Sequence, residues 1–201
     1  TWLYGAVGKD IAGHKIIEIL LQNNISSRVC QDAEITTIKT RMVGQNGQHL
    51  LRVDKELLYT KSTVEDELLK DLEQTDVVLV SDYDKGVIQK DTVQKILTKC
   101  KNVYVDPKQG FSKYIGAFLV KPNMKEYEAW FGKFNISIAQ DRCKSNLWTW
   151  LIVTDGANGI HVVSKDSYKH IKGNAIEVSD VSGAGDSVLA IIAHYSQYKD
   201  I

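Results

Sequence analysis

Five short apolar runs recur between residues 75 and 164, and most of them are followed by a stretch of helical composition. Runs that are apolar at every position, and not at alternate positions, indicate strands buried on both faces. Strands that alternate with helices favour a mostly parallel sheet with helices on both faces. The sequence therefore predicts an α/β fold. The predicted strands are Val77–Val80, Val103–Val105, Ala117–Val120, Leu151–Val153 and Ile160–Val163, and the predicted helices include Gln89–Lys101, Met124–Phe131 and Ser187–Tyr195.

The first seventy residues follow a different pattern. Lys9–Asn23 carries its apolar residues on one side, which predicts a short amphipathic helix. Thr36–Val43 and His49–Val53 are β-prone and flank an Asn-Gly pair, the strongest short signal for a hairpin. We expect this hairpin, over about residues 35–55, to be a small β lid or an oligomer contact. A helix over Ser62–Gln74 then leads back into the sheet.

Composition excludes several classes of protein. The chain has 201 residues, with 25 Lys and Arg against 25 Asp and Glu, so no basic field is present to gather nucleic acid or an anionic membrane surface. No apolar run approaches the roughly 20 residues of a membrane helix, and the first residues do not resemble a secretion signal. Three widely separated cysteines favour neither a disulfide framework nor a metal site. We expect a single cytoplasmic domain without nucleic-acid or membrane partners.

Polar and charged residues follow each of the first four predicted strands. In an open α/β sheet, ligands bind outside the carboxyl ends of the strands. Each residue alone is also explained by a turn or a helix cap, but together they predict a binding site at one edge of the sheet. These residues are Asp82 and Lys85 after the first strand, Asp106 and Lys108 after the second, Asn123 and Glu126 after the third, and Thr154, Gly156 and Gly159 after the fourth.

The segment from Asp180 to Asp186 reads Asp-Val-Ser-Gly-Ala-Gly-Asp and precedes an apolar helix. The small residues Gly183, Ala184 and Gly185 let backbone amides approach a ligand, and the positive end of the helix dipole attracts an anion. Asp186, in the first turn, could accept the proton of a hydroxyl group that attacks phosphorus. An ordinary glycine-containing loop with an acidic residue after it accounts for the same pattern.

Asn123 and Glu126 are three residues apart at the start of a predicted helix and therefore share one face. Both could reach a hydrated Mg²⁺, which prefers oxygen ligands. The same spacing is that of a capping box, and by itself the segment favours that structural role. The chain has no G-x-x-x-x-G-K-[ST], G-x-G-x-x-G or H-E-x-x-H pattern, which argues against a P-loop enzyme, a common dinucleotide-binding domain and a zinc protease.

The segment from Asp180 to Asp186 resembles the D-x-[ST]-G-A-G-D signature of the PfkB/ribokinase family of sugar kinases. The resemblance implies a ribokinase-like fold, an anion hole at Gly183–Gly185 and a catalytic base at Asp186. It also places Asp180 with the nucleotide-binding residues and implies ATP and Mg²⁺ as cofactors. Thr154–Gly159 resembles the family's T-x-G-x-x-G nucleotide loop, and Asn123 with Glu126 matches its N-x-x-E motif for the Mg²⁺–phosphate network.

Within the family, the strand-end segments and the hairpin look most like kinases that act on heptose 7-phosphate and make its 1,7-bisphosphate, a precursor of the lipopolysaccharide core. This implies a sugar-phosphate site formed by Asp82, Lys85, Lys108, Arg41 and Arg52. Another sugar kinase of the family, of ribokinase or fructokinase type, and a noncatalytic binding module remain alternatives. The hairpin is also a candidate contact for a homodimer.

The resemblance covers nearly the whole chain. By analogy with the family, an opening strand should precede Thr1 and further helices should follow Ile201. We therefore expect a kinase domain truncated at both ends.

Overall fold

The computed structural model of the chain describes residues 1–45, 48–59, 65–174 and 183–196. The chain divides into two compact units. The first comprises Thr1–Asp71 with Lys85–Gln89, and the second comprises Leu72–Asp84 with Lys90–Ile201. Among the described residues, none of the helices combines the length and the apolar character needed to cross a membrane.

The second unit is built on one sheet of six strands in the order β10-β9-β8-β7-β6-β5. Neighbouring strands from β5 to β8 are parallel, whereas β9 and β10 each run antiparallel to the strand before them. The five predicted strands are all present, and β10 is an addition. The strands are β5 (Val78–Asp82), β6 (Val103–Pro107), β7 (Leu119–Val120), β8 (Trp150–Thr154), β9 (Ile160–Val163) and β10 (Tyr168–Ile171).

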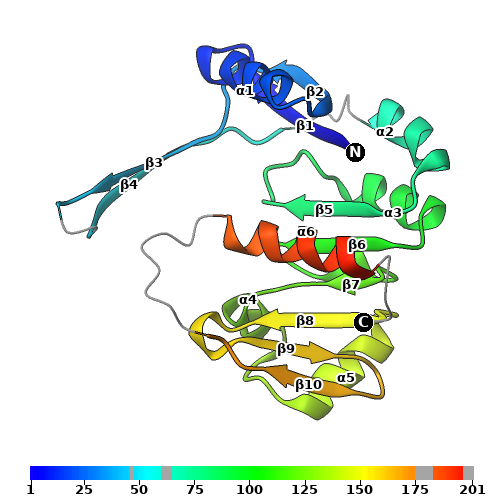
Figure 1. The fold of residues 1–201 in the computed structure, drawn as a ribbon. Coiled ribbons are helices and arrows are strands. Elements are labelled where there is room, and N and C mark those ends of the chain that lie inside the picture. The colour runs from blue at the N-terminus through cyan, green and yellow to red at the C-terminus, as the bar shows by residue number, and fades with distance from the viewer. Residues whose placement is uncertain (46–47, 60–64, 175–182, 197–201) are drawn as a thin grey trace. The chain divides into compact units, whose positions relative to one another are not determined.

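Helices lie on both faces of this sheet, as predicted. Figure 1 shows α6 in front of the strands, and α4 and α5 behind them. The helix predicted over Ser187–Tyr195 begins three residues earlier, so that Asp186 lies in its first turn. The elements are α3 (Lys90–Lys99), α4 (Met124–Phe131), α5 (Ile136–Ser145) and α6 (Ala184–Ser196), with short 3₁₀ turns η1 (Leu72–Gln74), η2 (Ser112–Tyr114) and η3 (Gly156–Asn158).

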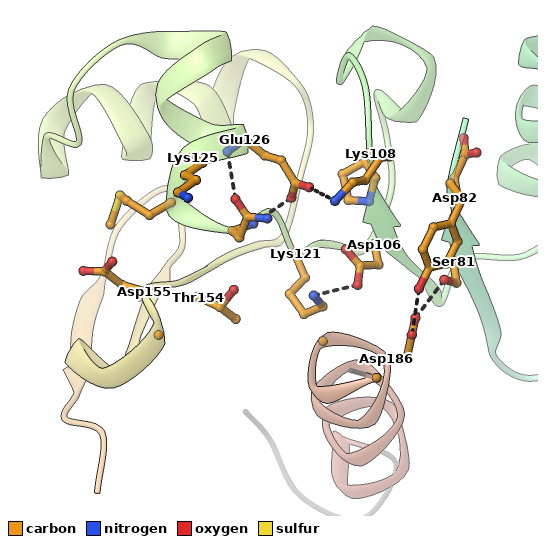
Figure 2. A pocket seen from close by; sticks show the side chains of 17 residues that line it. Ser81, Asp82, Asp106, Lys108, Lys121, Lys125, Glu126, Thr154, Asp155 and Asp186 are labelled. Atoms are coloured by element: carbon orange, nitrogen blue, oxygen red, sulfur yellow. Dashed lines mark hydrogen bonds and ion pairs between the residues drawn. The ribbon is translucent and has the colours of Figure 1, made fainter. Parts of the chain in front are cut away.

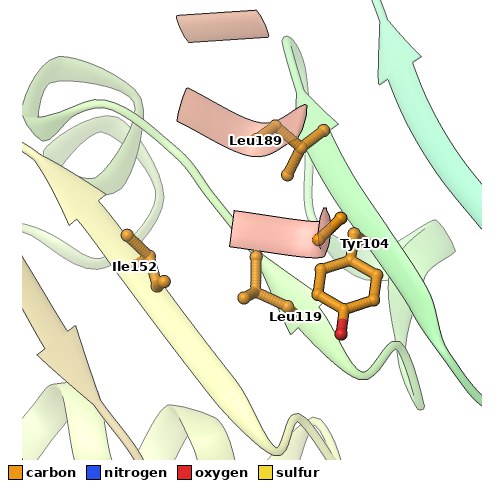
Figure 3. Packing of buried hydrophobic residues seen from close by; sticks show 5 residues of the cluster. Tyr104, Leu119, Ile152 and Leu189 are labelled. Atoms are coloured by element: carbon orange, nitrogen blue, oxygen red, sulfur yellow. The ribbon is translucent and has the colours of Figure 1, made fainter. Parts of the chain in front are cut away.

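The apolar side of α6 fixes the position of that helix on the sheet. Leu189 and Ala193 are buried against Tyr104, Leu119 and Ile152, which come from β6, β7 and β8 (Figure 3). Burying one such side chain contributes about 1.5–3 kcal/mol relative to leaving it exposed. The start of α6 is therefore held at the edge of the sheet where the parallel strands end.

In the first unit, a parallel pair of strands is joined by a helix. Asp10 caps that helix by accepting a hydrogen bond of 2.9 Å from the Gly13 amide, and it also binds the amide and hydroxyl of Thr36. The predicted hairpin is present, although its Asn-Gly turn at residues 46–47 lies outside the described residues. The elements are β1 (Trp2–Gly8), α1 (Ile11–Gln22), β2 (Ser26–Ala33), β3 (Ile38–Val43), β4 (His49–Lys55) and α2 (Glu65–Asp71), of which β1 and β2 were not predicted.

Candidate active site

A cavity of about 720 Å³ lies at the carboxyl ends of β5, β6, β7 and β8 and at the start of α6. All of its lining residues belong to the second unit. Figure 2 shows their side chains arranged around the opening, with Lys121 and Asp186 both beside the start of α6. Every strand-end segment singled out in the sequence contributes to this wall, as expected for an open α/β sheet.

Asp186 is held at the cavity by two hydroxyl groups from β5 and the loop after it. Its carboxylate accepts hydrogen bonds of 2.8 Å from Ser81 Oγ and 3.0 Å from the Tyr83 hydroxyl. Burial raises the pKa of Tyr83, and the hydrogen bond to Asp186 raises it further, so this phenol stays protonated and donates. The carboxylate that the sequence predicts as a base is thereby oriented on the cavity wall.

The start of α6 requires small residues. Gly183 has φ of +76°, a conformation that residues with a side chain rarely adopt. A Cβ on Gly185 would lie 3.3 Å from Asp106 Oδ2 and 3.4 Å from Lys121 Nζ, so the backbone closely approaches both groups. Ala184 opens the helix. Asp180, predicted to bind nucleotide, lies outside the described residues.

Directly beside this turn is an ion pair between Asp106 and Lys121, two strand-end residues whose pairing the sequence analysis did not predict. Lys121 Nζ lies 2.7 Å from Asp106 Oδ2, and Lys121 is almost completely buried. Burial raises the pKa of Asp106, and nearby Glu126 and Asp186 act in the same direction, while Lys121 opposes them. The signal that could have identified Lys121 is a lysine directly after the fully apolar run Ala117–Val120.

Asn123 and Glu126 form the capping box of α4. Asn123 Oδ1 accepts a hydrogen bond of 2.9 Å from the Glu126 amide, and Glu126 Oε2 accepts one of the same length from the Asn123 amide. Glu126 Oε1 also pairs with Lys108 Nζ at 2.8 Å. Each side-chain oxygen retains a further lone pair, so the two residues fit a hydrated Mg²⁺ in addition to capping the helix.

Within the described residues, no cluster of three or more His, Cys, Asp or Glu side chains is arranged to hold a metal ion directly. A metal at this cavity would therefore keep much of its water, as Mg²⁺ commonly does.

The loop from Thr154 to Gly159 forms a tight turn between β8 and β9. The Asp155 amide donates to Gly159 O at 2.8 Å, and the Asn158 amide donates to Asp155 O at 3.0 Å. Among the described residues, the amides of Gly156 and Ala157 have no such partner. Thr154 and Gly156 line the cavity, whereas Gly159 does not and instead packs against the backbone of Ile171.

Two of the predicted sugar-phosphate residues border the cavity, with different surroundings. Lys108 is half exposed and pairs with Glu126. Asp82 is buried and accepts from the Tyr114 hydroxyl, pairs with Lys113 and accepts from the Asp84 amide at 2.8 Å. Its carboxylate therefore fixes the loop after β5.

The other three predicted sugar-phosphate residues belong to the first unit. Lys85 pairs with Glu56, which also binds Lys39 Nζ at 2.7 Å. Arg41 and Arg52 are direct partners across the β3–β4 hairpin, and Arg52 Nε lies 3.1 Å from Asp54 Oδ1. Like charges placed directly opposite each other destabilise a hairpin, and an anion bound between Arg41 and Arg52 would offset their repulsion.

The sequence pattern of pfkB family carbohydrate kinases matches residues 1–200. The bifunctional protein HldE of Sulfurimonas denitrificans is 36% identical over 209 residues, which cover 94% of this chain and 43% of that protein. The D-beta-D-heptose 7-phosphate kinase of Bordetella bronchiseptica is 34% identical over 205 residues, covering 95% of this chain and 64% of that enzyme. The chain therefore spans less than two thirds of these relatives.

Solved structures agree on the fold. Ribokinase from Thermotoga maritima superposes with a TM-score of 0.77 at 21% identity, over 99% of this chain and 69% of the ribokinase. Phosphofructokinase-2 from Escherichia coli, in complex with substrates and products, superposes with a TM-score of 0.77 at 17% identity, over 100% of this chain and 71% of the phosphofructokinase. The α/β fold with its mostly parallel sheet is ribokinase-like, and the chain belongs to the pfkB family of carbohydrate kinases.

Proposed function

We propose that the protein is an ATP-dependent sugar kinase that phosphorylates the anomeric hydroxyl of D-glycero-β-D-manno-heptose 7-phosphate. The observation that carries the proposal is the Asp186 carboxylate, oriented by Ser81 and Tyr83 on the cavity wall at the start of α6. The name of the D-beta-D-heptose 7-phosphate kinase relative supports the choice of sugar. The product would be the 1,7-bisphosphate, which serves ADP-heptose and lipopolysaccharide synthesis.

In this reaction Asp186 accepts the proton of the anomeric hydroxyl while the hydroxyl oxygen forms a bond to the γ-phosphorus of ATP. The bond from that phosphorus to the β–γ bridging oxygen breaks, and ADP leaves with the electron pair. Amides at Gly183–Gly185 and the dipole of α6 stabilise the negative charge on the transferring group. Gly156 and Ala157 have amides available for other phosphate oxygens.

Asn123 and Glu126 would hold Mg²⁺ through water. Held there, the ion would supply positive charge that offsets the charge of the nucleotide phosphates. The donor chemistry supports this assignment, since an amide oxygen and a carboxylate are both hard oxygen ligands. Because ATP is available in the cytoplasm, we infer that the protein works there.

The phosphate of the sugar requires fixed positive charge, because a dianion loses much hydration on binding. We assign this role to Lys85, Lys108, Arg41 and Arg52. A ribokinase or fructokinase activity would leave these cations without a ligand. A noncatalytic binding module would bind ATP and sugar phosphate without forming ADP.

The β3–β4 hairpin is also proposed as a homodimer contact, because its apolar side chains are exposed. Light scattering of the protein and of the Leu51→Glu variant tests this: a dimer that becomes a monomer supports it, and an unchanged mass contradicts it. The exposed apolar residues are Met42, Val43, Leu50, Leu51 and Val53.

The proposed activity is tested by measuring ADP release from the native full-length protein with heptose 7-phosphate, free heptose, ribose and fructose. A higher kcat/KM for heptose 7-phosphate than for the other sugars supports the proposal. A preference for ribose or fructose would instead assign another activity of the family. Binding of ATP and sugar phosphate without ADP release would favour the noncatalytic module.

A further inference from the structure

Lys121 combines deep burial with a place on the cavity wall. It follows β7, is 2% exposed and still lines the cavity (Figure 2). An ammonium group placed in the protein interior loses several kcal/mol of hydration, and its attraction to one carboxylate seldom exceeds that cost. Apolar residues in place of such a pair commonly give an equally stable fold. Stability alone therefore does not account for a lysine at this position.

The surroundings of Lys121 are rich in carboxylates. Asp106 is its ion-pair partner at 2.7 Å, and Glu126 and Asp186 are close enough to raise the pKa of Asp106. The other cations on the wall are the exposed Lys108 and Lys125. Among the described residues, Lys121 is thus the buried and immobile positive charge of the cavity.

Lys121 also lies next to the start of α6. A Cβ on Gly185 would be 3.4 Å from Lys121 Nζ, so the ammonium group is close to the first turn of the helix. An ammonium has three N–H donors, and the structure gives this one a single partner among the described residues, Asp106. Two donors and the positive end of the helix dipole are available to the same anion.

We propose that Lys121 binds an oxygen of the β- or γ-phosphate of ATP, and that Asp106 is the residue that positions it. The inference rests on the proposed function for the nature of the anion. The ammonium group is already dehydrated and fixed in the folded protein, so it contributes to phosphate binding without a further ordering cost. Asp106 acts through Lys121 and does not itself contact the nucleotide.

The experiment compares four forms of the native full-length protein: wild type, Lys121→Met, Lys121→Arg and the double variant Asp106→Asn with Lys121→Met. Removal of Lys121 alone leaves the partly buried Asp106 carboxylate without its partner, which can destabilise the fold. The double variant removes both charges with little change in shape. Its thermal midpoint and its dissociation constants for ATP and AMP, measured by calorimetry without sugar, separate binding from folding.

The double variant is expected to melt close to wild type and to bind ATP roughly 10- to 100-fold more weakly, the effect of losing one charged hydrogen bond. Its affinity for AMP should be unchanged, because AMP lacks the β- and γ-phosphates. Lys121→Arg should recover part of the ATP affinity.

Unchanged ATP affinity in the double variant, an equal loss for ATP and AMP, or no ATP binding by wild type would each overturn the inference. Because no sugar is present, these results do not depend on the acceptor. A wild-type protein that binds ATP but phosphorylates no sugar would contradict the proposed function and leave the role of Lys121 to be decided by the binding data.

Discussion

The Asp186 carboxylate in the first turn of α6 accepts a hydrogen bond of 2.8 Å from the hydroxyl of Ser81 at the end of β5, 105 residues earlier in the chain. This contact joins the helix that carries the proposed base to the strand beside the cavity. Tyr83 adds a second donor at 3.0 Å. The proposed base is therefore oriented before any substrate binds.

Asp186→Asn should abolish most of the turnover while nucleotide binding is kept. Asparagine preserves the size of the side chain and the helix start but cannot accept the hydroxyl proton. A general base contributes about 10²- to 10⁴-fold to the rate, so kcat should fall by that factor in a coupled ADP assay. Near-normal kcat in a folded variant would remove Asp186 from the catalytic role.

Ser81→Ala and Tyr83→Phe should each lower kcat by a smaller amount. A hydrogen bond to a charged carboxylate contributes about 1.5–3 kcal/mol, which sets an upper limit of roughly 10- to 100-fold on the loss of kcat. The KM for ATP should remain the same, because neither hydroxyl is proposed to bind nucleotide. Tyr195→Phe, on the exposed far end of α6, is the matched control and should behave as wild type. A large rise in KM for ATP would show that these hydroxyls bind the nucleotide.

The strands of the sheet could be predicted from sequence because their apolar runs are buried on both faces. Val103, Val105, Leu151 and Val153 are completely buried, and this burial requires continuous apolar residues. The edge strand β10 was missed because most of its residues are exposed and polar. In β2, the polar sequence Ser-Ser-Arg-Val-Cys-Gln-Asp-Ala carries no such apolar run.

The cavity residues could be predicted as a group, since parallel strands bring their carboxyl ends to one edge. Their pairings could not. The contact of Ser81 with Asp186 joins segments 105 residues apart and depends on where α6 packs on the sheet. The contact of Lys121 with Asp106 depends on β7 lying directly beside β6. The alternative explanation of Asn123 with Glu126 as a capping box is realised in the structure, which leaves the metal role to experiment.

Glu126→Gln tests that metal role. Glutamine supports a capping box as glutamate does, so the stability of α4 should be kept. The loss of the carboxylate charge should raise the Mg²⁺ concentration needed for half-maximal rate by about tenfold or more. Lys108→Met removes the ion-pair partner of Glu126 and leaves its carboxylate, so it should not raise the Mg²⁺ concentration needed for half-maximal rate. A Mg²⁺ titration identical to wild type in Glu126→Gln would leave this residue with a capping role alone.

The loop between β8 and β9 should be far more sensitive at Gly159 than at Gly156. Gly156 has φ of +53° with open space around it, so Gly156→Ala should cost about 1–2 kcal/mol of backbone strain. At Gly159, with φ of +102°, a Cβ would lie 2.0 Å from Ile171 O. Gly159→Ala must displace that backbone and should cost about 3 kcal/mol or more. Urea unfolding of both variants measures the difference, and equal midpoints would contradict it.

His161 should make the stability depend on pH. Burial, and then the neighbouring His170, hold the pKa of His161 below its usual value, while Asp155 acts in the opposite direction. The unfolded chain therefore takes up a proton more readily than the folded one, so the free energy of unfolding is highest above about pH 6.5 and falls below it. His161→Phe should reduce the loss between pH 7.5 and 5.5, pH values that fall on either side of about 6.5. The control His14→Gln, at an exposed residue, should lose as much stability over this pH range as wild type does. Identical slopes in wild type and His161→Phe would exclude this contribution.

The last prediction concerns the choice of sugar. The Lys85 ammonium group is paired with Glu56, whose pKa is lowered to about 2 by its hydrogen bonds to Lys39 and Lys85. If Lys85 also binds the phosphate of the acceptor, Lys85→Ala should reduce kcat/KM for heptose 7-phosphate by roughly 10- to 100-fold, the effect of one charged hydrogen bond. The value for free heptose should change little, because that sugar has no phosphate.

Lys39→Ala is the matched control, since it removes the other partner of Glu56 at 2.7 Å and carries no proposed contact with the sugar. Its preference for the phosphorylated sugar should equal that of wild type. An equal loss of preference in Lys39→Ala and Lys85→Ala would mean that the pairing around Glu56, and not a contact with phosphate, sets the specificity. Equal kcat/KM values for heptose 7-phosphate and free heptose in wild type would discard the heptose-phosphate assignment, whereas membership of the family rests on the match over residues 1–200 and would be unaffected.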